Sequence, residues 1–179
     1  MAENLILNAN NEALNGQVFS TIRMGNILGS RGSVLPLFEE QKNTGELTIT
    51  DEEMTRFFIT PKQAAKQVLS SIEIMQGGEI FVPKLKSAKI INLAKETAPN
   101  CKLKIIGALK EEKLHEDLIT NEELPKTYEL QDRYVILPSK NKFTEAKKIS
   151  DDFSISSADK DIELTAQELK EMIADSLTN

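Results

Sequence analysis

The sequence contains little of what marks a secreted or membrane protein. Its 179 residues include one cysteine, Cys101, and a single cysteine cannot form an internal disulfide. No run of about 18 consecutive apolar residues is present, so no transmembrane helix is expected. The first five residues have no basic stretch ahead of an apolar one, so no signal peptide is predicted. These absences predict a protein of the reducing cytoplasm that does not associate with membranes.

The chain also lacks an excess of positive charge. It carries 22 basic and 28 acidic side chains, which gives a formal net charge of -6. Nucleic-acid binding requires a concentrated basic face, so this composition argues against it. A nucleotide ligand is still compatible, because a few well-placed arginines are enough to bind a diphosphate.

Apolar and polar residues alternate in a way that predicts helices interleaved with strands. We expect helices at 2–15, 34–41, 61–75, 111–119 and 165–177, and a further helix that Ser87 caps and that ends near Pro99. Strands or extended segments are expected at 17–24, 47–49, 54–59, 79–83, 103–107 and 133–137. Helices that alternate with strands throughout a chain are typical of the α/β class.

A glycine-rich loop at 25–32 is the most informative segment. It lies between an expected strand and an expected helix and contains three glycines and an arginine, Arg31, with Arg23 just before it. Ligands in open α/β sheets bind beyond the carboxyl ends of the strands, and glycines let the backbone approach them closely. Exposed N–H groups and arginines suit a phosphate, although a plain structural turn explains the same pattern equally well.

Four blocks, in order, resemble the UDP-N-acetylglucosamine 4,6-dehydratase group of the extended short-chain dehydrogenase/reductase superfamily. The blocks are Arg23-Met-Gly-Asn-Ile-Leu-Gly-Ser-Arg-Gly-Ser-Val34, Ile49-Thr-Asp-Glu-Glu-Met-Thr-Arg-Phe57, Gly77-Gly-Glu-Ile-Phe-Val-Pro-Lys84 and Glu112-Lys-Leu-His-Glu116. The resemblance covers roughly residues 2–120. It implies the C-terminal part of an extended Rossmann-type fold, with the last parallel strands and a small substrate-binding subdomain.

The resemblance also implies a set of residues that bind the nucleotide-sugar. Asn26 is expected to hydrogen-bond it, Arg56 to pair with its diphosphate, and Glu112 to accept a ribose hydroxyl. The full expected substrate set is Asn26, Ser30, Arg31, Gly32, Ser33, Val34, Arg56 and Glu112. Gly25 is expected beside the nicotinamide of the family's NADP.

Each of these residues has a simpler reading that the sequence leaves open. Asn26 could occupy a left-handed turn, and Arg31 could be an ordinary loop charge. Arg56 could pair with Asp51 or Glu53. Glu112 could be a solvated acid at a helix N-terminus. The only histidine, His115, is expected to be structural, and no second metal ligand stands at a suitable spacing.

Several parts of the family machinery are missing from this sequence. It has no Gly-x-x-Gly-x-x-Gly turn for NADP and no Tyr-x-x-x-Lys pair, and we assign no catalytic residue. Its first residues resemble the helix that follows the catalytic lysine. A family arginine, expected to be a second phosphate ligand, is replaced by Leu109, which puts diphosphate affinity in doubt.

These observations predict a nucleotide-sugar binding part at 1–138, a polar linker at 139–161 and a terminal helix at 162–179. One hypothesis is that the chain is part of a dehydratase, is inactive alone and holds no NADP by itself. The alternatives are a non-catalytic nucleotide-sugar binding module and a degenerate fragment. An uncovered first helix and an unpaired edge near 18–22 predict a poorly stable chain or one that associates, either with an N-terminal Rossmann half or with a second copy.

Overall fold

The computed structural model describes residues 2–12, 16–107, 110, 112–137, 143, 145–150 and 152–177. The chain divides into two compact units that each draw on three separate segments. Unit 1 comprises Met1–Met24, Ala65–Lys84 and Leu118–Ile155; unit 2 comprises Gly25–Ala64, Leu85–Asp117 and Ser156–Asn179.

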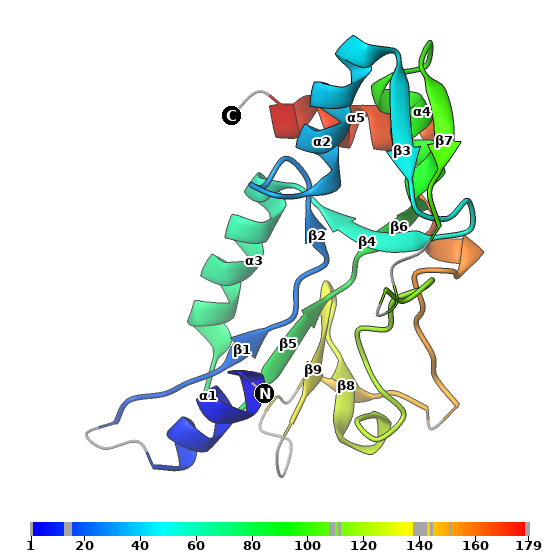
Figure 1. Ribbon diagram of the computed structural model, residues 1–179. Coiled ribbons are helices and arrows are strands. Elements are labelled where there is room, and N and C mark those ends of the chain that lie inside the picture. Colours follow the sequence, from blue (N-terminus) through cyan, green and yellow to red (C-terminus); the bar gives the residue numbers. More distant parts are fainter. Residues whose placement is uncertain are drawn as a thin grey trace. The chain divides into compact units, whose positions relative to one another are not determined.

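Unit 1 is built on one mixed five-stranded sheet (Figure 1). Its strands, in spatial order, are β1 (Thr21–Ile22), β5 (Ile80–Pro83), β9 (Arg133–Ile136), β8 (Thr127–Glu129) and β10 (Lys147–Lys148). Only β1 and β5 are parallel; the other pairs are antiparallel. The unit also contains α1 (Ala2–Asn11), the short helix η2 (Leu124–Lys126) and most of α3 (Pro61–Ile74). Phe81, Val135 and Leu137 form its buried apolar cluster.

Arg23 ties the two ends of unit 1 together directly after β1. Its guanidinium donates to Glu3 on α1 at 2.9 and 2.7 Å, and to Glu123 at 2.8 and 2.5 Å. It also donates to the carbonyl oxygen of Leu118 at 2.8 Å. This arginine therefore pairs within the protein, and its role is to hold α1 beside the segment before η2.

The Arg23 cluster makes stability depend on pH in acid. Burial raises the pKa of the Glu123 carboxyl, but hydrogen bonds from Arg23 and Thr120 lower it by more, so that this pKa lies below its ordinary value of 4.5. A pKa that is lower in the folded state stabilises the fold above the unfolded pKa, and this contribution is lost as the pH falls through the folded pKa.

We expect Arg23→Met to lower the free energy of unfolding by about 1–3 kcal/mol at neutral pH. In urea melts, that cost should shrink below pH 4; a cost that is equal at pH 7 and pH 3 would contradict this account.

Unit 2 contains two small sheets and three helices. One sheet has the order β2 (Asn26–Ile27), β4 (Thr55–Ile59) and β6 (Lys86–Lys89); the other pairs β3 (Glu46–Ile49) with β7 (Lys102–Ile105). The β2–β4 and β3–β7 pairs are parallel, whereas β4–β6 is antiparallel. The helices are α2 (Val34–Gln41), α4 (Ile90–Thr97) and α5 (Ala166–Leu177), with short helices η1 (Lys42–Thr44) and η3 (Lys160–Ile162).

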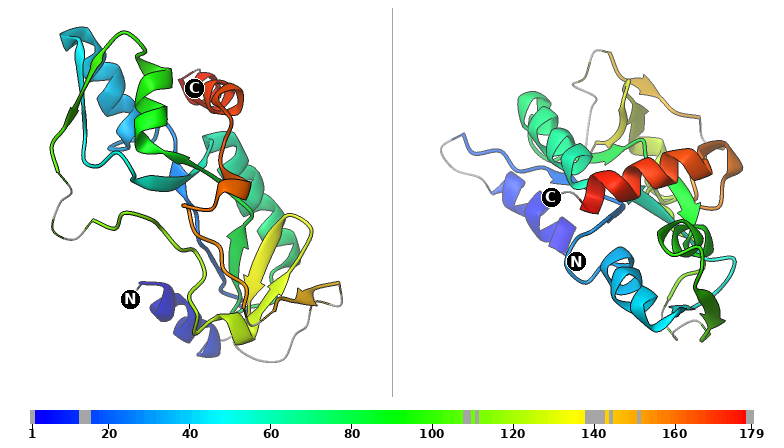
Figure 2. Two further views of the ribbon diagram at one scale, coloured as in Figure 1. Left: turned by 90° about the vertical axis from the view of Figure 1, so that its right-hand side faces the viewer. Right: turned by 90° about the horizontal axis from the view of Figure 1, so that it is seen from above.

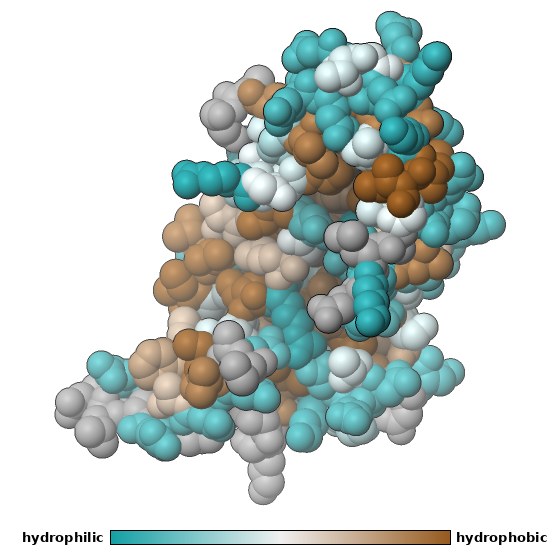
Figure 3. Space-filling model, in the orientation of Figure 1, coloured by the Kyte–Doolittle hydropathy of each residue, from teal (hydrophilic) through white to brown (hydrophobic). Residues whose placement is uncertain are grey.

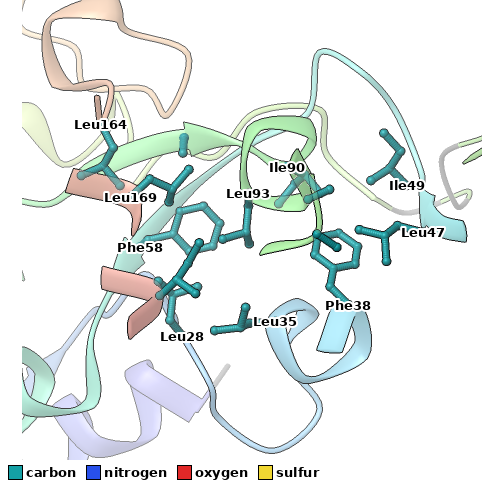
Figure 4. Close-up of a cluster of buried hydrophobic side chains, with 14 of the residues drawn as sticks. Leu28, Leu35, Phe38, Leu47, Ile49, Phe58, Ile90, Leu93, Leu164 and Leu169 are labelled. Atoms are coloured by element: carbon teal, nitrogen blue, oxygen red, sulfur yellow. The ribbon is translucent and has the colours of Figure 1, made fainter. Parts of the chain in front are cut away.

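The core of unit 2 joins residues that are far apart in the sequence. Leu28, Phe38, Leu93 and Leu169 are at most 1% exposed and belong to one apolar cluster (Figure 4). Leu169 comes from α5, which packs beside α4, as the views in Figure 2 show. The segment after residue 155 is therefore part of this core.

Two helices begin where the sequence signals predict. Thr60 and Gln63 form a reciprocal capping box before α3, with N–H···O distances of 2.9 and 3.2 Å. Thr165 and Glu168 form the same arrangement before α5, at 2.9 and 3.3 Å. Each box satisfies N–H groups that the first helical turn leaves unpaired.

Three local predictions were wrong. The segment predicted as a helix at 111–119 is not helical at any described residue. Ser87 does not cap a helix; it lies in β6, and Lys89 precedes α4. The strand predicted at 17–24 is limited to the two residues of β1, and β8 and β10 were not predicted.

Candidate functional site

A cavity of about 730 Å³ lies within unit 2. Its polar lining comes from Asn26, Ser33, Thr48, Thr50, Arg56 and Glu112, together with Glu40 and the backbone of Gly32. Apolar side chains cover the rest: Ile27, Leu28, Val34, Pro36, Leu37, Ile49, Met54, Phe58, Ile90 and Ile106. A few polar groups that converge in a mostly apolar cavity of this size are typical of a small-molecule site.

The N-terminus of α2 opens on this cavity. Ser33 occupies the cap position with extended backbone, but its side chain makes no capping hydrogen bond. Its hydroxyl oxygen is buried and has no hydrogen-bond partner among the described residues. The first N–H groups of a helix carry partial positive charge, so this end favours an anion.

Arg56 lies in β4 and is 9% exposed. Its Nη1 donates to the carbonyl oxygens of Thr55 at 2.7 Å and Leu114 at 3.2 Å. Two carboxylates lie further off, with Nη2 at 3.4 Å from Glu112 and Nε at 3.4 Å from Glu116. Both contacts are long for charge-assisted hydrogen bonds, which leaves the guanidinium able to bind an anion more closely.

The sequence left open an ion pair between Arg56 and Asp51 or Glu53, and the structure shows neither pair. Glu53 pairs instead with Lys89 at 2.7 Å, and Asp51 accepts from the Glu53 N–H at 2.7 Å. The segment after β7 supplies the partners of Arg56, about 56 residues further along the chain.

Glu112 lines the cavity, and one of its two carboxylate oxygens has no hydrogen-bond partner among the described residues. Its Oε1 contacts Arg56, whereas its Oε2 is buried without a hydrogen-bond partner among the described residues. A buried carboxylate oxygen is costly unless it accepts a hydrogen bond. The alternative of a solvated acid at a helix N-terminus is wrong, because the described residues around Glu112 form no helix.

Asn26 lies in β2 and pairs with Phe58 of β4, so the left-handed turn considered for it is wrong. Its Nδ2 donates to the Phe57 carbonyl oxygen at 3.2 Å and to Glu116 Oε2 at 3.2 Å. Its side-chain oxygen accepts no hydrogen bond from the described residues. Asn26 therefore offers the cavity an acceptor.

The predicted substrate residues fall into two groups. Asn26, Gly32, Ser33, Val34, Arg56 and Glu112 line the same cavity. Ser30 and Arg31 do not line it: Ser30 closes backbone turns with Ile27 and Ser33, and Arg31 is exposed. Sequence reasoning assigned no role to Glu116, although it belongs to the fourth quoted block. Leu109, whose side chain replaces an expected arginine, lies outside the described residues.

Gly25 is a glycine for reasons of packing. A Cβ placed on it would lie 2.8 Å from Phe57 Cβ, the Phe57 carbonyl oxygen and Leu85 Cδ1. Gly25 does not line the cavity, and its expected place beside a nicotinamide stays a prediction.

His115 is held in a hydroxyl network. Its Nδ1 lies 2.8 Å from Thr55 Oγ1, which lies 2.7 Å from Ser157 Oγ. Across the described ranges, no group of three or more His, Cys, Asp or Glu side chains could hold a metal ion. None of the helices in the described part of the chain is both long and apolar enough to span a bilayer.

The fold is α/β, and the cavity in unit 2 is its candidate site for a small molecule. The chain belongs to a family described as polysaccharide biosynthesis protein, whose pattern matches residues 1–138. One curated relative is the "UDP-N-acetylglucosamine 4,6-dehydratase (inverting)" of Campylobacter jejuni serotype O:2, which is 43% identical over 187 residues, covering 96% of this chain and 56% of that protein. Another is a "UDP-glucose 4-epimerase" of Rickettsia canadensis, which is 38% identical over 136 residues, covering 73% of this chain and 40% of that protein.

A solved structure confirms the fold class. The X-ray structure of Pen from Bacillus thuringiensis matches with a TM-score of 0.87 and 32% identity, over 99% of this chain and 56% of that one. The chain thus has the α/β fold expected for the C-terminal part of an extended Rossmann-type protein. It spans about half the length of the curated relatives it matches.

Proposed function

We propose that this chain supplies the nucleotide-sugar binding site of a 4,6-dehydratase that acts on a UDP-N-acetylglucosamine-like substrate in polysaccharide biosynthesis. One observation carries the proposal: Arg56, Glu112 and Ser33 at the N-terminus of α2 line the same cavity. An arginine beside a helix N-terminus suits phosphate oxygens, and a nearby carboxylate suits a hydroxyl donor.

The geometry suits the parts of a nucleotide diphosphate-sugar. The α2 N-terminus, Ser33 and Arg56 attract and hydrogen-bond phosphate oxygens. The Glu112 carboxylate can accept a hydrogen bond from a hydroxyl group, as a ribose diol provides. Leu37 and Ile106 are 45% and 55% exposed, and both line the cavity, where they offer apolar surface to a flat base.

The reaction type depends on residues outside this chain. Relatives named as a dehydratase and as an epimerase both match this region, which supports a shared substrate class rather than a shared reaction. The sequence has no glycine-rich dinucleotide turn, so this chain does not fit NADP by itself, and we assign the cofactor to a part that it does not include. When bound, NADP would accept and return a hydride. We propose the cytoplasm as the compartment, in line with the single cysteine.

Unit 1 has a surface suited to such a part. The strand β1 is at the edge of its sheet and pairs on one side only among the described residues. Six exposed apolar side chains belong to the same unit: Leu5 and Ile6 on α1, Val18 before β1, and Val68, Leu69 and Ile72 on α3. Apolar surface over α3 is visible on the left in Figure 3. We call these residues and the free side of β1 the open edge. A parallel edge strand, together with exposed apolar side chains on α1 and α3, fits a further parallel α/β layer, such as the part of the Campylobacter relative that this chain does not match.

Co-expression tests the open edge. We expect a one-to-one complex between this chain and the unmatched part of the Campylobacter dehydratase, measured by sedimentation. Leu69→Glu with Ile72→Glu should weaken the complex at least tenfold, because each buried apolar side chain contributes about 1.5–3 kcal/mol. The matched control is Leu177→Glu, an exposed leucine of α5 in unit 2. Self-association alone, or equal losses in both variants, would contradict the assignment.

Glu112 provides the test of the substrate class. Glu112→Ala should weaken binding of UDP about tenfold or more relative to binding of pyrophosphate, because only UDP has a ribose diol, whereas loss of the negative charge beside Arg56 favours both anions. Calorimetric titrations of both ligands measure this. No saturable binding of UDP to the parent chain would favour a degenerate fragment. Tight binding of UDP-N-acetylglucosamine by a chain that gains no activity with the unmatched part would favour a binding module without catalysis.

A further inference from the structure

The side chain of Glu116 contacts two residues that line the cavity. Its Oε2 accepts from Asn26 Nδ2 at 3.2 Å and, at 3.4 Å, from the Phe57 N–H. Its Oε1 lies 3.4 Å from Arg56 Nε. Glu116 does not line the cavity itself. One carboxylate therefore bridges Asn26 and Arg56, two side chains that line the cavity.

This bridge decides which atom Asn26 offers to a ligand. The two neighbours of its amide nitrogen, Glu116 Oε2 and the Phe57 carbonyl oxygen, are both acceptors. Only the NH₂ group can face them, because an amide oxygen there would meet two other oxygens. The free atom of Asn26 is consequently its oxygen, which accepts hydrogen bonds from hydroxyl or amide donors and repels phosphate.

Glu116 is itself held by the C-terminal segment. The Ser157 N–H donates to the Glu116 carbonyl oxygen at 2.9 Å, and the Glu116 N–H donates to Ser157 Oγ at 2.8 Å. Ser157 is 1% exposed, and its hydroxyl also lies 2.7 Å from Thr55 Oγ1 and 3.2 Å from the Thr55 carbonyl oxygen. That same carbonyl accepts from Arg56 Nη1. Ser157 lies beyond residue 138, where the family match ends.

We infer that Glu116 is a positioning residue that turns the Asn26 oxygen toward the ligand and orients Arg56, and that Ser157 of the C-terminal segment holds Glu116 in place. The inference rests on the proposed function for its ligand, but its geometry is independent of it. The segment after residue 155 thereby belongs to the site as well as to the core.

The charge of Glu116 and its positioning role predict opposite effects of Glu116→Gln on the affinity for an anionic ligand. Arg56 carries one positive charge and faces two carboxylates, so removing one of them should favour an anionic ligand if charge alone mattered. Positioning predicts the reverse. The NH₂ group of a glutamine would face either Asn26 Nδ2 or Arg56 Nε, both of which are donors. We expect Glu116→Gln to weaken binding of UDP-N-acetylglucosamine about tenfold or more. Glu53→Gln, which removes an equal charge at an exposed pair with Lys89, should change it less than twofold.

A double-mutant cycle separates positioning from general damage. Glu116→Gln, Asn26→Ala and the double variant are titrated with UDP-N-acetylglucosamine, and thermal melts verify that each remains folded. If Glu116 acts through Asn26, the double variant should bind much more tightly than the product of the two single effects allows. Multiplicative effects, or an unchanged affinity in Glu116→Gln, would overturn the inference.

The side-chain amide of Asn26 gives a second readout that needs no ligand. In ¹⁵N NMR spectra of the parent chain, its NH₂ resonances should be displaced from those of exposed asparagine amides, and Glu116→Gln and Ser157→Ala should both alter that displacement. An Asn26 amide that is indifferent to both substitutions would refute the positioning role. A chain that binds no nucleotide-sugar but shows the coupled amide would instead contradict only the proposed function.

Discussion

Arg56→Met is expected to reduce binding of UDP by at least about 30-fold, which corresponds to about 2 kcal/mol. Arg56 is the only arginine or lysine that lines the cavity among the described residues. Methionine keeps much of the volume of the side chain but removes every donor of the guanidinium. Calorimetry measures the affinity. A melt in parallel should also show a loss of stability, because the carbonyl oxygens of Thr55 and Leu114 lose the Arg56 donor and Glu112 loses its cation.

Arg31→Met is the matched control. Arg31 stands in the same glycine-rich loop that drew attention to phosphate binding, yet it does not line the cavity. We expect its replacement to change the affinity for UDP by less than about threefold, as for a screened surface charge. If Arg31→Met lost as much affinity as Arg56→Met, the cavity would be the wrong site.

Gly29→Ala is expected to destabilise unit 2 by about 2–4 kcal/mol. Gly29 has φ +75°, which disfavours any residue with a Cβ, and this strain costs about 1 kcal/mol. A Cβ would also lie 2.7 Å from the Ser176 carbonyl oxygen of α5, so the helix must shift, at a further cost of about 1–3 kcal/mol. Urea denaturation measures the total. Amide exchange should rise most in α5.

Gly32→Ala separates the two contributions. Gly32 has φ +80°, but nothing lies within 4 Å of an added Cβ. This variant should therefore lose only about 1 kcal/mol. Equal destabilisation by both substitutions would show that the approach of Gly29 to α5 does not contribute.

Much of the fold could be predicted because several elements carry local signals. The helix α2 has the predicted bounds, and α3 begins at Pro61 behind a capping threonine, as expected. The predicted helix at 111–119 failed for a tertiary reason. There the Leu114 carbonyl oxygen accepts from the Thr55 N–H and from Arg56, and the Glu116 backbone pairs with Ser157. Such partners lie about 40 to 60 residues away, and no local periodicity records them.

Only part of the candidate site could be predicted, because its remaining contacts join residues that are far apart in the sequence. The quoted blocks named Asn26, Arg56 and Glu112, and the structure brings them to one cavity. The pairing of Arg56 with Glu112 and Glu116 instead of Asp51 or Glu53 depends on how the segment after β7 returns to β4. Ser157 carried no signal at all, because a serine in a polar stretch is ordinary until the fold buries it.

The proposed function depends on a nucleotide-sugar site within unit 2. The most direct measurement is a titration of the ¹⁵N-labelled chain with UDP, followed by NMR. The account predicts saturable shifts at amides of 26–34, 48–58 and 112–116, with none of comparable size in β5, β8 or β9. Shifts that never saturate, or that centre on unit 1, would contradict it.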